Sequence, residues 1–243
     1  LGPMDEEVST ELQRAFEKKG VKFYLETKVT AVRPDVVVAE SNGSVLEIPY
    51  EKLLVSVGRR AVTDGLGLET LGVKLERGAI TVDRYMQTSV PGIYAIGDVN
   101  GVSMLAHTAA HEGVVAVDHI LGGREEMSYH AIPGIVYSNP EIASVGRTEQ
   151  ELQQGGAAYQ VHRVPMTLSG RFVIENEQAN GICKILTDES GVILGVHLLG
   201  NGSSEILVPA VMAVQCALKL SDLAKVVFPH PTVCEVLRLA ALH

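Results

Sequence analysis

The first part of the chain has a helical hydrophobic pattern followed by short strand-like runs. Apolar residues recur every three to four positions across residues 5–19, with acidic residues early and Lys18 and Lys19 at the end. This pattern predicts an amphipathic helix, whose dipole favours that order of charges. Gly20 is a typical residue just after a helix. Short apolar runs and turn residues then predict strands at 21–25 and from residue 27, and a hairpin over residues 35–48 that turns at Asn42 and Gly43.

Two runs in the middle of the chain are apolar without alternation, as strands buried on both faces are. One covers residues 53–57, and the other, residues 92–96, leads into Gly97 and Asp98. A helix is predicted to start near Met104. Open α/β sheets bind ligands just past the carboxyl ends of strands, so Asp98 is a candidate acceptor for sugar or ribitol hydroxyls. The helix N-terminus is a candidate site for an anion such as a pyrophosphate. These residues alone fit a buried strand, a turn and a core helix equally well.

From about residue 127 the pattern changes to short strands and apolar helices. Strands are predicted at 133–137, 141–146, 159–164, 181–186 and 192–199, and helices at 148–154, at 204–220, from residue 221 and at 232–242. This order predicts an antiparallel sheet with helices on one face, an α+β layout.

Composition excludes several classes of function. The chain has 243 residues and a net charge of −9, whereas a nucleic-acid-binding protein normally has a basic face. No segment is long and apolar enough to span a bilayer. We therefore expect neither a nucleic-acid partner nor a membrane. The three cysteines are far apart, which argues against a disulfide framework, and residues 1–5 do not look like a signal peptide. These features predict a cytoplasmic location.

A second candidate site is the sequence His-Pro-Thr-Val-Cys-Glu at residues 230–235. Pro231 forbids a helical conformation at His230 and suits the first position of a helix, so His230 is expected in a loop at a helix N-terminus. Glu235 follows about one turn later, within reach of the imidazole. A carboxylate behind a histidine fixes its tautomer and raises its basicity, as in a general base with an orienting partner. From these residues alone, a capping histidine and a surface glutamate are the favoured interpretation.

The sequence contains no Gly-x-Gly-x-x-Gly motif and no closely spaced cysteine pair. It therefore has no complete dinucleotide fingerprint and no redox-active disulfide of its own. A domain that opens with a helix and two strands, without a phosphate-binding loop, is expected to be the remnant of a larger βαβ unit.

The segment Tyr-Ala-Ile-Gly-Asp at residues 94–98, followed by Met-Leu-Ala-His at residues 104–107, resembles the second FAD-contact motif of the pyridine nucleotide–disulfide oxidoreductases. Its spacing matches that of the dihydrolipoamide dehydrogenases within this family. The resemblance implies that Asp98 holds the ribitol of FAD and that residues 104–107 lie along the flavin and pyrophosphate. The implied FAD-binding residues are Gly97, Asp98, Met104, Leu105, Ala106 and His107.

The resemblance covers the whole chain and implies its organisation. Residues 1–55 resemble the end of the family's NAD-binding domain, residues 56–126 an FAD-binding segment, and residues 127–243 the interface domain. The implied fold is an α/β remnant of a Rossmann-like NAD/FAD-binding region, followed by an α+β dimerisation domain with an antiparallel sheet. The family's NAD-contact positions fall on Val29 and Gly58, which by themselves fit a core valine and a turn glycine.

In this family a His–Glu pair exchanges a proton with a substrate dithiol beside the flavin, in the active site of the other subunit. The resemblance implies that His230 is the general acid/base, that Glu235 orients it, and that the protein is a homodimer. It also implies the C-terminal part of an enzyme that passes electrons through a cysteine pair and FAD to NAD⁺. The implied substrate is dihydrolipoamide on a lipoyl-bearing protein of a 2-oxoacid dehydrogenase or glycine cleavage complex.

Two alternatives stay open. One is a glutathione- or mercuric-type reductase, which shares the His–Glu pair, and the other is a non-catalytic dimerisation module. For a part of a dihydrolipoamide dehydrogenase, we expect the chain alone to be inactive as a dehydrogenase and to bind FAD weakly or not at all.

Overall fold

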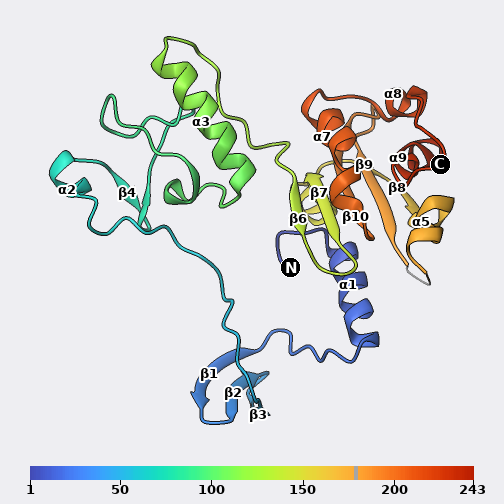
Figure 1. The fold of residues 1–243 in the computed structure, drawn as a ribbon, viewed down its shortest axis with the longest axis horizontal. Helices are drawn as coiled ribbons and strands as arrows, with labels where there is room; N and C mark the ends of the chain where they lie inside the picture. The colour runs from blue at the N-terminus through green and yellow to red at the C-terminus, as the bar shows by residue number, and fades with distance from the viewer. Residues whose placement is uncertain (178–179) are drawn as a thin grey trace. The chain divides into compact units, whose positions relative to one another are not determined.

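The computed structural model describes residues 1–177 and 180–243, which form two compact units (Figure 1). The first, here called the sheet unit, combines residues 1–23 with residues 129–243. The second, the central unit, consists of residues 24–128. Each unit is described by itself.

The sheet unit is built on a five-stranded antiparallel sheet, as predicted. The strands follow the order β6-β7-β10-β9-β8, so that β10 lies in the middle. Their bounds are β6 Gly134–Val136, β7 Ile142–Gly146, β8 Gln160–Pro165, β9 Ile182–Thr187 and β10 Ile193–Leu199. In the register of the three central strands, His197 pairs with Ser144 on one side and with Lys184 on the other. These three polar side chains therefore share one face of the sheet.

The opposite face of the sheet carries the larger hydrophobic core. Ala143, Val145, Cys183, Val196 and Leu198 point into it and meet buried residues of the C-terminal helices. The helices that follow the last strand are α6 Ser203–Ile206, α7 Val208–Gln215, α8 Leu220–Lys225 and α9 Glu235–Leu242. Two further helices lie between strands in the sequence, α4 Glu149–Gln154 and α5 Gly170–Glu175. A 3₁₀ turn, η2 Met166–Leu168, precedes α5. No helix in residues 1–177 and 180–243 is long and apolar enough to cross a bilayer.

The predicted helix 204–220 is two short helices instead of one. Pro209 stands in the first turn of α7, where its missing N–H costs nothing, and α7 stops at Cys216, before Ala217 with a φ of +48°. The predicted capping box of α4 is present: Thr148 Oγ1 accepts from Glu151 N, and the Glu151 carboxylate accepts from Thr148 N.

Helix α1, Glu6–Lys18, packs on the second face of the sheet. Its buried residues Val8 and Leu12 contact Ile142, Ile182 and Leu199, which alternate with the core-facing residues of the same strands. The expectation of helices on one face only is therefore wrong. The apolar side chains of Ile142, Ile182 and Leu199 on this face must be shielded from water, and the apolar face of α1 packs on them. The predicted division at residues 55 and 126 concerns family segments and stays a prediction.

The central unit opens with a three-stranded antiparallel sheet. Strands β1 Lys28–Arg33, β2 Val36–Ser41 and β3 Ser44–Pro49 lie in that order. The predicted hairpin is present, with positive φ angles of 49° at Asn42 and 77° at Gly43. The remaining elements are α2 Leu68–Leu71, β4 Leu75–Glu76, β5 Ala79–Ile80, a 3₁₀ turn, η1 Gly97–Asn100, and helix α3 Ala106–Ile120.

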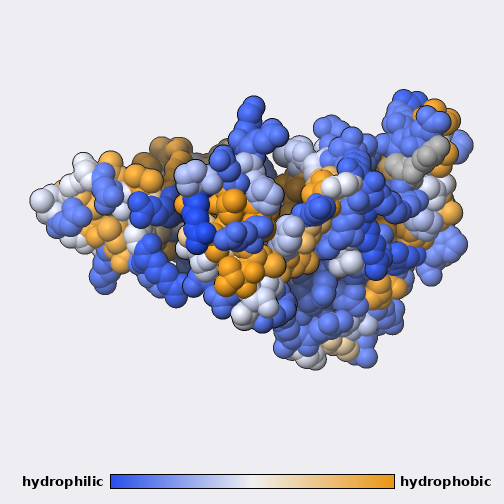
Figure 2. All heavy atoms as spheres, turned by 90° about the horizontal axis from the view of Figure 1, so that it is seen from below, coloured by the Kyte–Doolittle hydropathy of each residue, from blue (hydrophilic) through white to orange (hydrophobic). Residues whose placement is uncertain are grey.

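Three predicted strands are not formed. Residues 21–25 and 53–57 have no strand pairing, and Leu54 and Val57 are 88% and 93% exposed. Residues 92–96 contribute a single bridge, between Tyr94 and Gln87. A strand buried on both faces needs hydrogen-bonded neighbours and covering layers, which the described residues do not supply at these positions. Apolar side chains accordingly reach the surface in several patches (Figure 2).

Candidate functional site

His230 and Glu235 form a hydrogen-bonded pair in the sheet unit. His230 Nδ1 lies 2.8 Å from Glu235 Oε2, and Glu235 Oε1 accepts from Thr232 N at 3.4 Å. The His230 side chain is 78% exposed and that of Glu235 is 15% exposed. The imidazole is thus accessible to a substrate, while the carboxylate behind it is held in place. The contact predicted from the sequence is present, and the roles of the two residues stay predictions.

The pair is positioned by the loop between α8 and α9. Thr232 anchors this loop, since its hydroxyl donates to Pro229 O at 2.7 Å and its carbonyl accepts from Ser169 Oγ at 2.9 Å. Helix α9 begins at Glu235 and not at residue 232 as predicted, because Thr232 and its neighbours bond to the loop and to Ser169 instead. Glu235 is therefore the first helical residue, where the helix dipole favours a carboxylate.

A cavity of about 360 Å³ lies at the pair and is also lined by Phe228 and Arg238. A neutral imidazole that donates from Nδ1 to Glu235 has Nε2 left as its acceptor. Such a pair can take up a proton at Nε2 from an acid such as a thiol, and Glu235 then stabilises the imidazolium. Burial raises the pKa of the neighbouring Cys234 thiol, which favours its interpretation as a packed residue.

The FAD-motif residues are organised around Glu112, which the sequence analysis did not identify. Glu112 is fully buried on α3, and its Oε2 accepts from Gly97 N at 2.6 Å and from Asn100 Nδ2 at 3.0 Å. It thereby fixes η1, which carries Asp98, against the helix. The sequence does indicate a buried acid here, because the spacing of Thr108, Glu112 and Val115 places all three on the inward face of a helix.

The FAD-motif residues fit an anionic, hydroxylated group. Asp98 is exposed and can accept hydrogen bonds from hydroxyls. Helix α3 has fifteen residues, and its N-cap residue Leu105 makes no side-chain cap, so the positive end of the helix dipole favours an anion at this terminus. Gly97 has a φ of +74°, and a Cβ there would lie 3.2 Å from Ala109 Cβ, so the backbone comes close to the helix. Met104 and Leu105 are half-buried, and Ala106 and His107 are exposed.

The predicted NAD contacts are not brought together in the described residues. Val29 lies in β1 with an exposed side chain, and Gly58, with a φ of +118°, lies in a segment without helix or strand. The assignment of these two positions to NAD binding stays a prediction.

Metal-binding geometry is not found in residues 1–177 and 180–243, where no group of three or more His, Cys, Asp and Glu side chains could hold an ion. The three cysteines, Cys183, Cys216 and Cys234, are free thiols.

Comparison with known proteins identifies relatives over almost the whole chain. Dihydrolipoyl dehydrogenases of Caenorhabditis elegans mitochondria and of Homo sapiens mitochondria are each 39% identical to 98% of the chain, and dihydrolipoyl dehydrogenase 3 of Pseudomonas putida is 37% identical. The chain covers 50%, 48% and 53% of these proteins, respectively. It thus spans about half the length of the curated relatives it matches.

Solved structures show the same relationship. The structure of LpdA from Mycobacterium tuberculosis matches 98% of the chain with a TM-score of 0.84 and 29% identity, over 52% of its own length. The HOCl-induced flavoprotein disulfide reductase RclA from Escherichia coli matches 100% of the chain with a TM-score of 0.86 and 26% identity, over 56% of its length.

Two family models match successive parts of the chain. Residues 1–113 match the pyridine nucleotide-disulphide oxidoreductase model, and residues 132–241 match the dimerisation domain of the same family. Both models, the relatives and the fold agree, and the chain therefore belongs to the pyridine nucleotide-disulphide oxidoreductases.

Proposed function

We propose that this chain is part of a dihydrolipoyl dehydrogenase in which His230 is the general acid/base and Glu235 its orienting partner. The observation that carries the proposal is the 2.8 Å contact between an exposed imidazole and a held carboxylate. Members of the family use FAD and NAD(H). The proposed reaction oxidises dihydrolipoamide and reduces NAD⁺.

In the proposed mechanism, His230 Nε2 accepts the proton of a substrate thiol as its sulfur becomes nucleophilic. Glu235 holds the proton on Nδ1 and stabilises the imidazolium that forms, which is the role of an orienting carboxylate. The proton is returned at the same nitrogen when a thiol is regenerated. General acid–base catalysis of this kind contributes about 10²–10⁴-fold to a rate.

For FAD, Asp98 is proposed to bind ribityl hydroxyls, and the N-terminus of α3, with residues 104–107, to bind the pyrophosphate. FAD supplies the electron acceptor when bound. Glu112 keeps Gly97 and Asn100 in the geometry that this binding requires. Val29 and Gly58 are proposed only as NAD contacts of the longer protein.

The proposed partners are a second copy of the chain and a lipoyl-bearing protein of a 2-oxoacid dehydrogenase or glycine cleavage complex. The homodimer is supported by the match to a dimerisation domain and by apolar side chains exposed on α7, Val208 and Met212, because exposed apolar patches favour an interface. A cytoplasmic location is a proposal from the cysteine content alone.

The test is a chimera in which this chain replaces the matching half of the Caenorhabditis elegans relative. Light scattering and the flavin absorbance of the same peak first establish an assembled, FAD-loaded protein. NAD⁺-dependent oxidation of dihydrolipoamide is then measured for the parent chimera, for His230→Ala and for His162→Ala as a control. We expect a loss of about 10²–10⁴-fold for His230→Ala alone. An assembled, flavin-loaded chimera that is indifferent to His230→Ala would instead support a non-catalytic dimerisation module, and turnover of glutathione disulfide in place of dihydrolipoamide would support a different reductase.

A further inference from the structure

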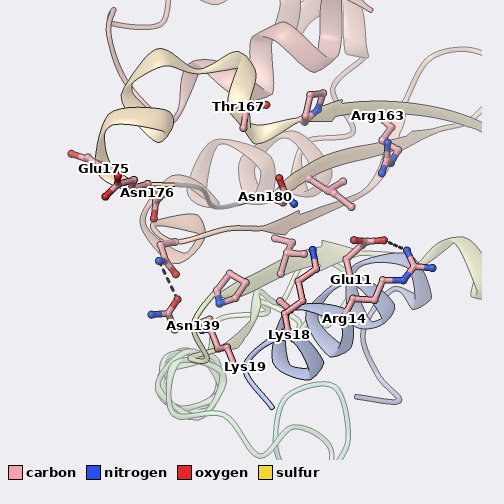
Figure 3. A pocket seen from close by; sticks show the side chains of 18 residues that line it. Glu11, Arg14, Lys18, Lys19, Asn139, Arg163, Thr167, Glu175, Asn176 and Asn180 are labelled. Carbon is pink, nitrogen blue, oxygen red and sulfur yellow. Dashed lines mark hydrogen bonds and ion pairs between the residues drawn. The ribbon is translucent and has the colours of Figure 1, made fainter. Parts of the chain in front are cut away.

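A cavity of about 720 Å³ in the sheet unit lies between α1 and the strands β8 and β9 (Figure 3). Its volume is within the range of about 300–1,000 Å³ that is typical of small-molecule sites. Helix α1 contributes one wall with Lys18 and Arg14, and the sheet side contributes Arg163, Thr167 and Asn180. A molecule in this cavity would contact both elements at once.

The cationic side chains around the cavity differ in whether an ion pair or a hydrogen bond engages them. Arg163 Nε lies 2.5 Å from Glu7 Oε1, Arg14 is paired with Glu11, and Lys19 Nζ donates to Asn139 O at 2.6 Å. In the described part of the chain, no hydrogen bond or ion pair engages the ammonium of Lys18. Lys18 and Asn180 extend into the cavity from opposite walls (Figure 3).

The rest of the lining includes apolar groups and three acidic side chains. Ala15, Pro140, Ile182 and Leu199 line the cavity with apolar groups. Glu175, on the far side from Lys18 in Figure 3, is paired with Arg171 outside the cavity, and Glu177 also contributes to the lining. Glu11 of α1 also lines the cavity, and its carboxylate is paired with Arg14. In residues 1–177 and 180–243, Lys18 is thus left as a lining cation that no ion pair compensates.

We propose that this cavity binds a small organic anion, a carboxylate or a phosphate monoester on an apolar body. The anionic group is held by the Lys18 ammonium and the Asn180 amide, and a charge-assisted hydrogen bond of this kind is stronger than a neutral one. The apolar body lies on Ile182, Leu199 and Pro140. Because the ligand bridges α1 and the sheet, it binds the folded sheet unit and raises its stability by mass action.

The experiment is a titration of the purified chain with phenyl phosphate, benzoate and neutral benzamide, followed by calorimetry and by the melting temperature. We expect saturable binding of one or both anions and a raised melting temperature. Benzamide should bind at least about tenfold more weakly, because it cannot make the hydrogen bond between an anion and the Lys18 ammonium. Which anion binds more tightly distinguishes a phosphate from a carboxylate ligand.

Three variants test whether Lys18 binds the anion. Lys18→Glu and Lys18→Gln should each weaken anion binding at least about tenfold, and the neutral variant tests the charge without adding an acid. Lys22→Glu is the matched control, because Lys22 is an exposed lysine just after α1 that does not line the cavity. No saturable binding of either anion, equal binding of benzamide, or equal weakening by Lys22→Glu would each overturn the proposal.

Discussion

The ammonium of Lys184 in β9 lies 2.9 Å from Asp5 Oδ1, although 179 positions separate the two residues in the sequence. The side chains are 1% and 0% exposed. Lys184 Nζ also lies 2.5 Å from Glu149 Oε2 and 3.2 Å from Glu7 Oε2, while Asp5 accepts from the backbone N–H groups of Glu7 and Glu149. A single buried cation therefore joins the start of α1, the start of α4 and strand β9 of the sheet.

Replacing Lys184 by Met should destabilise the sheet unit strongly. The change leaves the Asp5 carboxylate buried without its cation, and breaking a buried ion pair in this way costs about 3–5 kcal/mol. Denaturant unfolding followed by circular dichroism measures this cost. Lys225→Met is the control, because Lys225 is 77% exposed and makes only a surface ion pair. Equal stability of the two variants would show that the buried pair does not hold α1.

Stability should fall as the pH is lowered from 7 toward 5 because of His197. Burial is the main cause that lowers the pKa of His197 in the folded chain, against the opposing charge of Asp5. A histidine with a depressed folded pKa contributes stability above its unfolded pKa of about 6.5, and this stability is lost as the pH falls below that value.

The expected slope is at most about 1.4 kcal/mol per pH unit for one proton. His197→Gln should flatten this part of the stability profile, while His243→Gln at the exposed C-terminus should not. A profile in which both variants follow the parent chain would contradict the assignment to His197.

The Asp5 carboxylate predicts a second, more acidic loss of stability. Burial by itself acts to raise the pKa of Asp5, but His197, Lys184 and the Glu149 N–H outweigh it, and the net pKa lies below the ordinary value. Stability from a depressed carboxyl pKa is present above its unfolded value of about 3.9 and is lost as the pH falls through the folded value. The free energy of unfolding of the parent and that of Asp5→Asn should therefore differ mainly above pH 4, where only the parent retains the ion pair. Unfolding measured over a series of acidic pH values tests this.

Glu112→Ala should loosen the loop that carries Asp98. The substitution leaves Gly97 N–H and the Asn100 amide without their acceptor, and an unsatisfied buried polar group costs about 1–3 kcal/mol. Hydrogen exchange at Gly97 should become faster, and any FAD affinity measured in the assembled chimera should fall. Glu125→Ala, at an exposed position, serves as the control, and unchanged exchange at Gly97 would contradict the role given to Glu112.

Gly97→Ala tests the close approach of the same loop to α3. The new Cβ meets Ala109 Cβ at 3.2 Å and also forces a left-handed backbone on a residue with a side chain, which costs about 1–2 kcal/mol. Gly156→Ala shares the positive φ, at +63°, but has open space around the added carbon. The destabilisation by Gly97→Ala should exceed that by Gly156→Ala, as measured by thermal unfolding, and the reverse order would rule out a packing constraint at Gly97.

The features that sequence reasoning anticipated are those determined within a few residues. The His230–Glu235 contact spans five positions and depends on Pro231 and a helix start, and the Asn42–Gly43 hairpin depends on two adjacent residues. The contact between Asp5 and Lys184 depends on how distant elements pack, which no local pattern contains. The strand expected at 53–57 was predicted from its apolar run, but a strand exists only with partners, and those are set by the rest of the fold.

Because α1 and the sheet are one body, the chain leaves this body at residue 23 and returns to it at residue 129. Residues 51–60 lie between these points without helix or strand, and most are exposed. A protease that cuts there would divide the polypeptide without separating its pieces, because Val8, Leu12 and the Asp5–Lys184 pair would still bind α1 to the sheet. Noncovalent contacts, and not the chain between residues 23 and 129, therefore hold α1 on the sheet.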